Sequence, residues 1–431
     1  MAAVGTLYTN AEVEPSLSLN PLNPTNLVGA WQQDRWSNGG SHGVLLGSSS
    51  DGGHTWAIAQ VPFSRCTGGN SVNGGDYTRA SNPWVSFSPS GTAYALALVF
   101  TGNVFAAGSS SAMRVAQSAD GGVTWSAPRT LIADGPQAFN DKGAITADPT
   151  DAHFVYAVWD RLTSNIHAPT MFARSTDSGA TWETARVIYD PGDGNQTIGN
   201  IIVVLPKGAL VNVFTEIDDL DLVTQHSSLR AVQSSDHGVT WGAPVQIAQL
   251  LSIGVRDPDT GAAVRDASIL PSVAVDAAGA LYMVWQDARF SNGARDAVVF
   301  SRSTDGGASW SAPVQISKSA TTQAFDPVVH VRADGVIGVT YYDFRNNTSS
   351  AQTLLTDYWL VTSSDATNWT ETHITGPFDL SLAPQAPGFF LGDYQSLVSS
   401  GARFLPFFAK ANDGNAANRT DIFLGFVDVA R

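Results

Sequence analysis

The chain has 431 residues and a formal net charge of −15, because 38 Asp and Glu residues outnumber 23 Lys and Arg residues. This charge disfavours nucleic acid and anionic membrane surfaces as partners. The single cysteine, Cys66, excludes an internal disulfide, and no apolar run reaches the ~18 residues that a membrane span needs. We therefore expect a soluble protein.

Composition favours strands over helices. The chain has 40 glycines, and short runs of Val, Thr, Tyr, Phe and Trp are broken by Asp-Gly and Ser-Gly pairs. Such runs are typical of short strands joined by tight turns. The predicted fold class is all-β.

An eight-residue motif, Ser-x-Asp-x-Gly-x-Thr-Trp, recurs along the chain. Its copies occupy residues 49–56, 118–125, 175–182, 234–241 and 303–310, and a degenerate copy occupies 363–369. The aspartate accepts backbone N–H bonds, the glycine takes a positive φ and the tryptophan packs between sheets. Each copy therefore predicts the turn of a β-hairpin.

The spacing of the motif predicts how many units there are. Its aspartates are 57 to 69 residues apart, with a mean of about 63, which suits a four-stranded unit and divides the chain into about seven. A pair of strands precedes each motif, as in 272–289 and 328–345, and a seventh pair at 394–413 is followed by one more strand at 420–429. We predict a single seven-bladed β-propeller domain over residues 1–431, with six blades as the alternative. Residues 4–10 are expected to pair beside 420–429 and close the ring.

Charged residues recur where this topology brings the chain to one face of the propeller. If the motif turns join strands three and four at the bottom, the starts of first strands and the ends of second strands meet around the axis at the top. Second strands end in Asp34-Arg35, Asp160-Arg161, Glu216, Asp287 with Arg289, and Asp343 with Arg345; first strands start with Glu14, Arg79, Asp141-Lys142, Arg265-Asp266, Asp326 and Asp393-Tyr394.

Two interpretations of these residues remain open. Arginine pairs bidentately with carboxylates, so a pocket lined by Arg35, Arg79, Arg161, Arg289 and Arg345 fits an anionic or polyhydroxylated ligand. Alternatively, the Asp-Arg pairs are salt bridges between blades that repeat with the fold.

The motif resembles the Asp box, or bacterial neuraminidase repeat, of the sialidase-like β-propellers, and the resemblance covers nearly the whole chain. It implies a glycoside hydrolase with a tyrosine nucleophile, activated by a carboxylate, and an arginine cluster for the sugar carboxylate. The segment GDYQSL resembles the last-blade motif of the family, which nominates Tyr394 as nucleophile and Glu216 as its activator. The remaining predicted binding residues are Asp141, Asp160, Asp287, Asp343 and Asp393.

Two segments depart from the family pattern. The first strand reads AEVEPSL where the family has Tyr-Arg-Ile-Pro, so Val13 and Glu14 occupy the place of its first arginine. The stretch that holds the acid/base aspartate in the family reads NGGSHGVLL here. Asp34 or His42 is then the candidate acid/base, or the chemistry differs.

The alternatives are a polysaccharide lyase and a non-catalytic carbohydrate-binding propeller. A lyase uses arginine to neutralise a uronate and His or Tyr to move protons, and His42, His167 and His226 follow second strands. For the binding protein, Trp36, Trp84, Trp159 and Trp285 are the candidate sugar platforms. We expect no cofactor and no metal, a carbohydrate as the ligand, a monomer, and a secreted or extracellular location.

Overall fold

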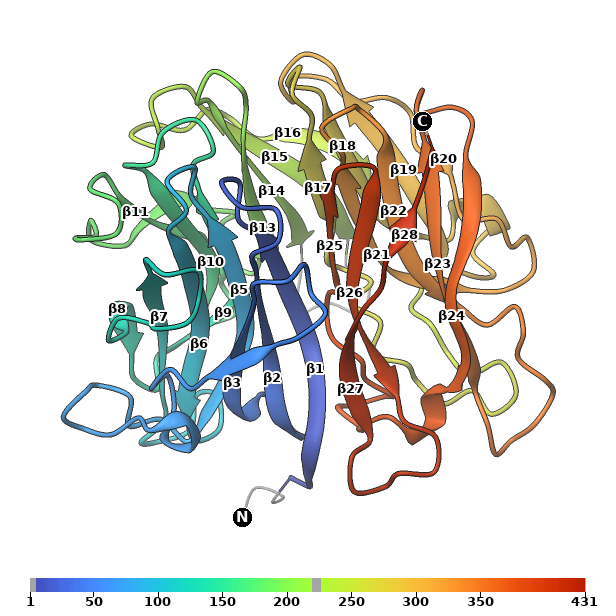
Figure 1. Ribbon diagram of the computed structural model, residues 1–431, viewed down its shortest axis with the longest axis horizontal. Helices are drawn as coiled ribbons and strands as arrows, with labels where there is room; N and C mark the ends of the chain where they lie inside the picture. Colours follow the sequence, from blue (N-terminus) through green and yellow to red (C-terminus); the bar gives the residue numbers. More distant parts are fainter. Residues whose placement is uncertain (1–4, 219–225, 431) are drawn as a thin grey trace.

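The computed structural model describes residues 5–218 and 226–430 and consists almost entirely of antiparallel strands (Figure 1). Its helical segments in this part of the chain are three short 3₁₀ turns, η1 (Arg65–Thr67), η2 (Arg289–Ser291) and η3 (Leu380–Leu382). The all-β prediction is confirmed. None of these helical segments is long and apolar enough to cross a membrane.

The strands follow one another in groups of four along the chain. The first strands are β1 (Leu7–Leu19), β5 (Arg79–Phe87), β9 (Ala138–Ala147), β13 (Gln196–Val204), β17 (Ser272–Val275), β21 (Ala324–Val331) and β25 (Ser396–Ser400). The second strands are β2 (Leu27–Trp36), β6 (Ala93–Thr101), β10 (Val155–Thr163), β14 (Leu210–Asp218), β18 (Leu281–Asp287), β22 (Ile337–Asp343) and β26 (Arg403–Ala411).

Third strands extend each group outward, and fourth strands extend the first six groups further. The third strands are β3 (Ser41–Ser49), β7 (Ser110–Ser118), β11 (Thr170–Ser175), β15 (His226–Ser234), β19 (Ala297–Ser303), β23 (Leu355–Ser363) and β27 (Thr420–Leu424). The fourth are β4 (Ala57–Ala59), β8 (Arg129–Asp134), β12 (Arg186–Tyr189), β16 (Val245–Gln249), β20 (Val314–Gln315) and β24 (Thr370–Asp379), with β28 (Val427–Asp428) last in the chain. A single pairing, Ser41 with Ala80, joins the first two groups into one eight-stranded sheet.

The first strands surround the centre of the molecule. Each contacts the first strand of the next group, and the contact between β25 and β1 closes this circle. Apolar side chains fill the space between neighbouring sheets, as where Val211 and Leu229 pack with Met283 and Trp285. Trp159 and Trp285, two of the candidate sugar platforms, are fully buried in this core and unavailable to a ligand.

The expected ring closure by the amino-terminal strand is wrong. Leu7 pairs with Trp36 and Tyr8 with Arg35, so β1 pairs with β2 over its whole length; Val4 lies outside the described residues. In the last group, β27 and β28 both pair with β26. The strand β1 lies beside β27 (Figure 1), but the contact is through side chains, such as the Glu12 carboxylate that accepts a hydrogen bond from the Ile422 N–H at 3.1 Å. The reason is local: Leu7 and Tyr8 extend β1 alongside the end of β2, which supplies their partners, and the Asn10 N–H donates to the Asp34 side chain in β2.

Each Asp box connects the third and fourth strands of its group, as predicted. In the box between β19 and β20, Asp305 Oδ1 accepts hydrogen bonds from the Ser309 N–H (2.9 Å) and the Ser303 hydroxyl (2.7 Å). Ser303 Oγ in turn accepts the Gly307 N–H at 2.8 Å, and the Trp310 indole donates to the Gly307 carbonyl at 3.3 Å. These bonds within eight residues hold the turn, so its role is structural.

Replacing Ser303 with alanine should lower the free energy of unfolding by about 1–3 kcal/mol, because a buried Gly307 N–H loses its acceptor. Urea denaturation measures this change. Activity per folded molecule should stay the same, since the box lies in the turn between β19 and β20, away from the first strands. A loss of turnover without a change in stability would contradict the structural role.

Candidate active site

A distortion repeats at the same place in each group. The first strand, or the segment leading into it, contains a residue with a positive φ, and the pairings of β1, β5, β13 and β21 shift register there; β1 has a second such residue at Asn10. A bulge of this kind turns a side chain away from its regular direction. The positions are Glu14, Asn82, Lys142, Gly199, Ala267, Asp326 and Gly392. Of these, Lys142, Gly199, Ala267 and Asp326 line the central cavity.

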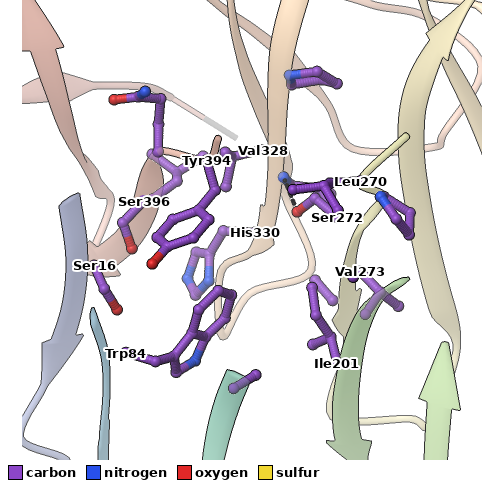
Figure 2. A pocket seen from close by; sticks show the side chains of 18 of the residues that line it. Ser16, Trp84, Ile201, Leu270, Ser272, Val273, Val328, His330, Tyr394 and Ser396 are labelled. Carbon is purple, nitrogen blue, oxygen red and sulfur yellow. Dashed lines mark hydrogen bonds between the residues drawn. The ribbon is translucent and has the colours of Figure 1, made fainter. Parts of the chain in front are cut away.

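This central cavity, enclosed by the first strands, has a volume of about 320 Å³ (Figure 2). Its wall is largely apolar, with Ile201, Leu270 and Val273 on one side, and Val328 also lines it. The rings of Trp84 and Tyr394 lie next to each other with centroids 5.2 Å apart. Polar groups also line it: Ser16, Ser272, Ser396, His330, Asn200, Lys142, Asp326 and Asp393.

Asp326 is a buried acid at the cavity. Within the described part of the chain, neither of its carboxyl oxygens has a hydrogen-bond partner, and the residue is 4% exposed. Burial, together with the negative charges of Asp266 and Asp393, raises the pKa of Asp326 well above its usual range. Burial and the neighbouring negative charges therefore favour the protonated, uncharged form of this side chain.

The pKa of Asp393, which also lines the cavity, is shifted in the opposite direction. It accepts hydrogen bonds from Lys142 Nζ and from Arg265 Nε, the latter at 2.7 Å. Burial opposes ionisation, but the charges of Arg265 and Lys142 outweigh it and hold the pKa of Asp393 well below its usual range. The cavity thus contains one carboxyl group with a raised pKa and one with a lowered pKa.

Glu14 adds a third carboxyl group beside this pair. Its Oε1 is 4.0 Å from Lys142 Nζ, and its Oε2 accepts a hydrogen bond from the Gln32 amide. Burial raises the pKa of Glu14 to about 7, and the neighbouring charge of Asp393 contributes to the rise. Asp393 therefore carries the negative charge of this pair, and Glu14 holds the proton more readily.

Loop segments cover one side of the charged cluster formed by Glu14, Lys142, Arg265 and Asp393. The sequence predicts an open pocket on that side. The guanidinium groups of Arg35 and Arg265 both lie over the ring of Phe390, with their Cζ atoms 4.5 and 4.8 Å from its centroid. Val13 and Ala386 pack against Phe390. Backbone hydrogen bonds of Phe389 with Ala263 and Arg265 join the two covering loops. The side chain of Arg35 is consequently buried and does not line the cavity.

Three other predicted pocket arginines are engaged in ion pairs away from the cavity. Arg161 pairs bidentately with Asp134, Arg289 with Asp287, and Arg345 with both Asp343 and Glu371. Second strands lie one strand further from the axis than first strands, so their ends do not reach the cavity. These contacts are salt bridges, but only the pair of Arg161 with Asp134 joins two groups of strands, whereas Arg289 and Arg345 pair within their own groups.

Glu216 and Tyr394 are not brought together. The Tyr394 hydroxyl donates to the Pro83 carbonyl at 2.8 Å, whereas Glu216 accepts a hydrogen bond from Tyr189 and pairs with Arg230 at 2.9 Å. Burial raises the pKa of Tyr394 well above its usual range. The predicted removal of the Tyr394 proton by Glu216 therefore has no support in this geometry.

The remaining predicted residues fall in two places. Asp34 lies 3.6 Å from His42, and the Arg79 guanidinium donates to Asn38 (2.9 Å) at the turn between β2 and β3. Asp160 is buried opposite Asp141 in the β9–β10 pairing, and burial followed by the charge of Asp141 raises the pKa of Asp160 well above its usual range.

The histidine cluster that favours a lyase does not form around one cavity. The His42 ring faces Asp34, and His167 is hydrogen-bonded to Asp190 at 2.7 Å. His42 and His167 have separate partners on different groups, and none of His42, His167 and His226 lines the central cavity.

The sequence places Lys142, Arg265 and Asp326 at the starts of first strands but does not single them out as site residues. A usable signal exists for Asp326. Asp287 and Asp343 each have an arginine two residues later, which satisfies them, whereas the segment AFDPVV around Asp326 contains no cation. An aspartate at the start of a first strand, with no lysine or arginine within a few residues, is therefore the sequence pattern that indicates such a site residue.

Acid should destabilise the protein through His330, which lines the cavity and whose pKa burial lowers to about 4. The unfolded chain takes up this proton near pH 6.5 and the folded chain near 4, so stability falls as pH drops across that interval. Urea midpoints at pH 7 and pH 5 should differ less in His330→Asn than in the parent. An equal difference in both proteins would show that His330 is not the group responsible.

A family comparison identifies the chain. The sequence profile of the BNR repeat-like domain matches residues 25–265, more than half of the chain. The chain belongs to the BNR repeat-like domain family. The resemblance to the Asp-box, sialidase-like propellers is therefore confirmed. No curated protein is similar enough in sequence to count as a relative.

Solved structures share the fold of this BNR repeat protein along most of its length. A Dyadobacter fermentans protein of unknown function has a TM-score of 0.53 and 12% identity, covering 99% of this chain and 98% of its own. An α-L-arabinanase of Penicillium chrysogenum, complexed with arabinobiose, has a TM-score of 0.51 and 13% identity, with the same coverages. A Hadza microbial sialidase has a TM-score of 0.50 and 16% identity, covering 94% of this chain and 73% of its own. At these low sequence identities, the similarity shows a shared fold and nothing more.

Proposed function

We propose that this BNR repeat protein is a glycoside hydrolase that binds a neutral, polyhydroxylated sugar unit in the central cavity. The observation that carries the proposal is Asp326, a buried carboxyl group without a hydrogen-bond partner in the described chain, which lines the same cavity as the ionised Asp393. Two carboxyl groups whose pKa values are pushed apart are the usual basis of acid and base roles in one site.

The two carboxyl groups have different tasks in glycoside hydrolysis. Burial and neighbouring negative charges raise the pKa of Asp326, so in the proposed reaction it donates its proton to the oxygen of the leaving group as the glycosidic bond breaks. Water then forms the new bond to the anomeric carbon, and the deprotonated Asp326 takes the proton that this water releases. Asp393 remains ionised beside Arg265 and Lys142, and it stabilises the positive charge that develops on the sugar ring. Trp84 and Tyr394 form the aromatic wall against which the sugar ring packs.

The charge of the cavity favours a neutral sugar over a sialic or uronic acid. Among the described residues that line it, Lys142 is the one lysine or arginine, and its ammonium group is already paired with Asp393. A sugar carboxylate would find no unpaired cation there and would meet the negative charge of Asp393. The volume, about 320 Å³, is at the small end of ligand pockets and suits a single sugar ring. The arabinobiose complex of the structurally similar arabinanase makes neutral pentosides the first substrates to test.

The number of blades is also part of this proposal. We infer seven blades in one propeller over residues 1–431, because the first strands form a closed circle and seven positive-φ positions repeat around it. The protein is proposed to work as a secreted monomer.

The experiment is a turnover assay on matched fluorogenic glycosides. Methylumbelliferyl α-L-arabinofuranoside and hexosides represent neutral sugars, methylumbelliferyl sialoside represents an anionic one, and polygalacturonate followed by ultraviolet absorbance reports elimination. We expect hydrolysis of a neutral glycoside and none of the sialoside. Turnover of the sialoside alone would overturn the neutral-sugar assignment, and an unsaturated product would identify a lyase. No turnover, with sugar binding detected by quenching of tryptophan fluorescence, would identify a binding protein.

A further inference from the structure

Three side chains with different metal-binding atoms meet at the turn between β2 and β3. Asp34 is near the end of β2, His42 is in β3, and Cys66 is in η1. One ligand atom from each lies within 4.8 Å of the other two, and in the described chain this is the one group of three or more His, Cys, Asp or Glu residues so arranged. None of the three lines the central cavity, so this cluster is separate from the proposed sugar site.

The backbone holds the Asp34 carboxylate in a fixed direction. Asp34 has a positive φ of 62°, which a non-glycine residue rarely adopts. Its Oδ1 accepts a hydrogen bond from the Asn10 N–H at 2.8 Å, while Oδ2 lies 3.6 Å from His42 Nδ1. One carboxylate oxygen is thus anchored to the protein, and the other faces the imidazole.

Cys66 approaches β3 closely because residue 43 is a glycine. A Cβ atom at Gly43 would lie 3.5 Å from Cys66 Sγ and 3.0 Å from Thr67 Cγ2, a tight contact that glycine avoids. The Ser64 hydroxyl donates to the His42 carbonyl at 2.9 Å and ties the start of η1 to β3. The cysteine and the histidine are therefore positioned by the same segment of strand.

We propose that Asp34, His42 and Cys66 bind a divalent transition-metal ion of the zinc class. In tetrahedral zinc sites the ligand atoms are about 3.3–3.8 Å apart, so the cluster needs a contraction of about 1 Å at most, within the range of side-chain rotations. Thiolate and imidazole ligands select zinc-like ions over calcium and magnesium, which take oxygen ligands. The Cys66 thiol releases its proton to solvent when its sulfur binds the ion.

The site is open on one side. The side chain of His42 is 44% exposed and that of Asp34 is 18% exposed, and Cys66 is exposed. Three protein ligands leave a fourth position for water or a small external ligand, the arrangement of accessible rather than closed zinc sites.

Cobalt(II) tests this proposal directly because its thiolate complexes absorb in the near-ultraviolet. The full-length protein, treated with a chelator and dialysed, is titrated with Co²⁺. We expect a thiolate-to-cobalt band that saturates at one equivalent and disappears when Zn²⁺ is added. Cys66→Ser should abolish the band, and His42→Gln should weaken Co²⁺ binding by at least about tenfold, since even outer ligand partners affect affinity to this extent.

His153→Gln is the matched control, because His153 is an exposed histidine paired with an aspartate but has no cysteine beside it in the described chain. Its titration should equal that of the parent. Circular dichroism and the thermal midpoint confirm that each variant is folded. The proposal is overturned if the parent gives no thiolate band, or if the band and affinity survive in both Cys66→Ser and His42→Gln. The assay requires no glycosidase activity, so its result is independent of the proposed function.

Discussion

Replacing Asp326 with asparagine should lower kcat by about 10²- to 10⁴-fold, because the amide has the shape of the acid but no proton to donate to the leaving group. The KM should change little. Because burial raises the pKa of Asp326 and favours its uncharged form, the substitution should change neither charge nor volume much, and the thermal midpoint should stay the same or rise. The measurement is kcat on the neutral aryl glycoside that proves most active.

The pH profile separates loss of an acid from a general loss of fit. A general acid works when protonated, so kcat of the parent should fall as pH rises through the raised pKa of Asp326. Asp326→Asn should lack this alkaline limb. Asp148→Asn is the matched control, since Asp148 is equally buried but is hydrogen-bonded to Thr150 and Tyr156 away from the cavity. Parent-like turnover in Asp326→Asn would remove Asp326 from the mechanism.

The largest effect on stability is expected at Asp393. Asp393→Asn leaves the charges of Lys142 and Arg265 without their main partner in the interior, which should lower the free energy of unfolding by about 3–5 kcal/mol. The pKa of Asp393 lies below its unfolded value, so its contribution is present above the unfolded pKa and is lost as pH falls through the folded one. Urea denaturation at pH 7 measures the effect, and it should be smaller at acidic pH.

Two further proteins make this result interpretable. Asp428→Asn breaks the exposed pair between Asp428 and Arg403 and should change stability little, because solvent screens such pairs. Adding Lys142→Met to Asp393→Asn removes one of the two buried positive charges that have lost their partner. The double variant should therefore regain part of the lost stability. Equal destabilisation by Asp393→Asn and Asp428→Asn would show that burial of the Asp393 cluster has no energetic consequence.

The candidate site is only partly predictable from sequence. Tyr394 and Asp393 do line the cavity, because the last first-strand segment could be located from the repeat. Arg161, Arg289 and Arg345 could be assigned to strand ends, but the strand pattern does not say which neighbouring carboxylate a long side chain will reach. The proposed role of Asp326 depends on its carboxyl oxygens having no hydrogen-bond partner in the described chain. Only the tertiary structure shows which groups surround them.

The sequence by itself determined the all-β class, the hairpin turns and the family. The physical reason is that the information is local: Ser303, Asp305 and Gly307 hydrogen-bond to one another within a few residues of chain. Tertiary structure decided which strand pairs with residues 7–10, how Phe390 covers Arg35, and how the site charges are arranged. Arg265 and Asp393 are 128 residues apart in the chain, and Glu14 and Asp393 are 379 apart. Their pKa values depend on burial and on neighbours that only the closed circle of first strands brings into contact.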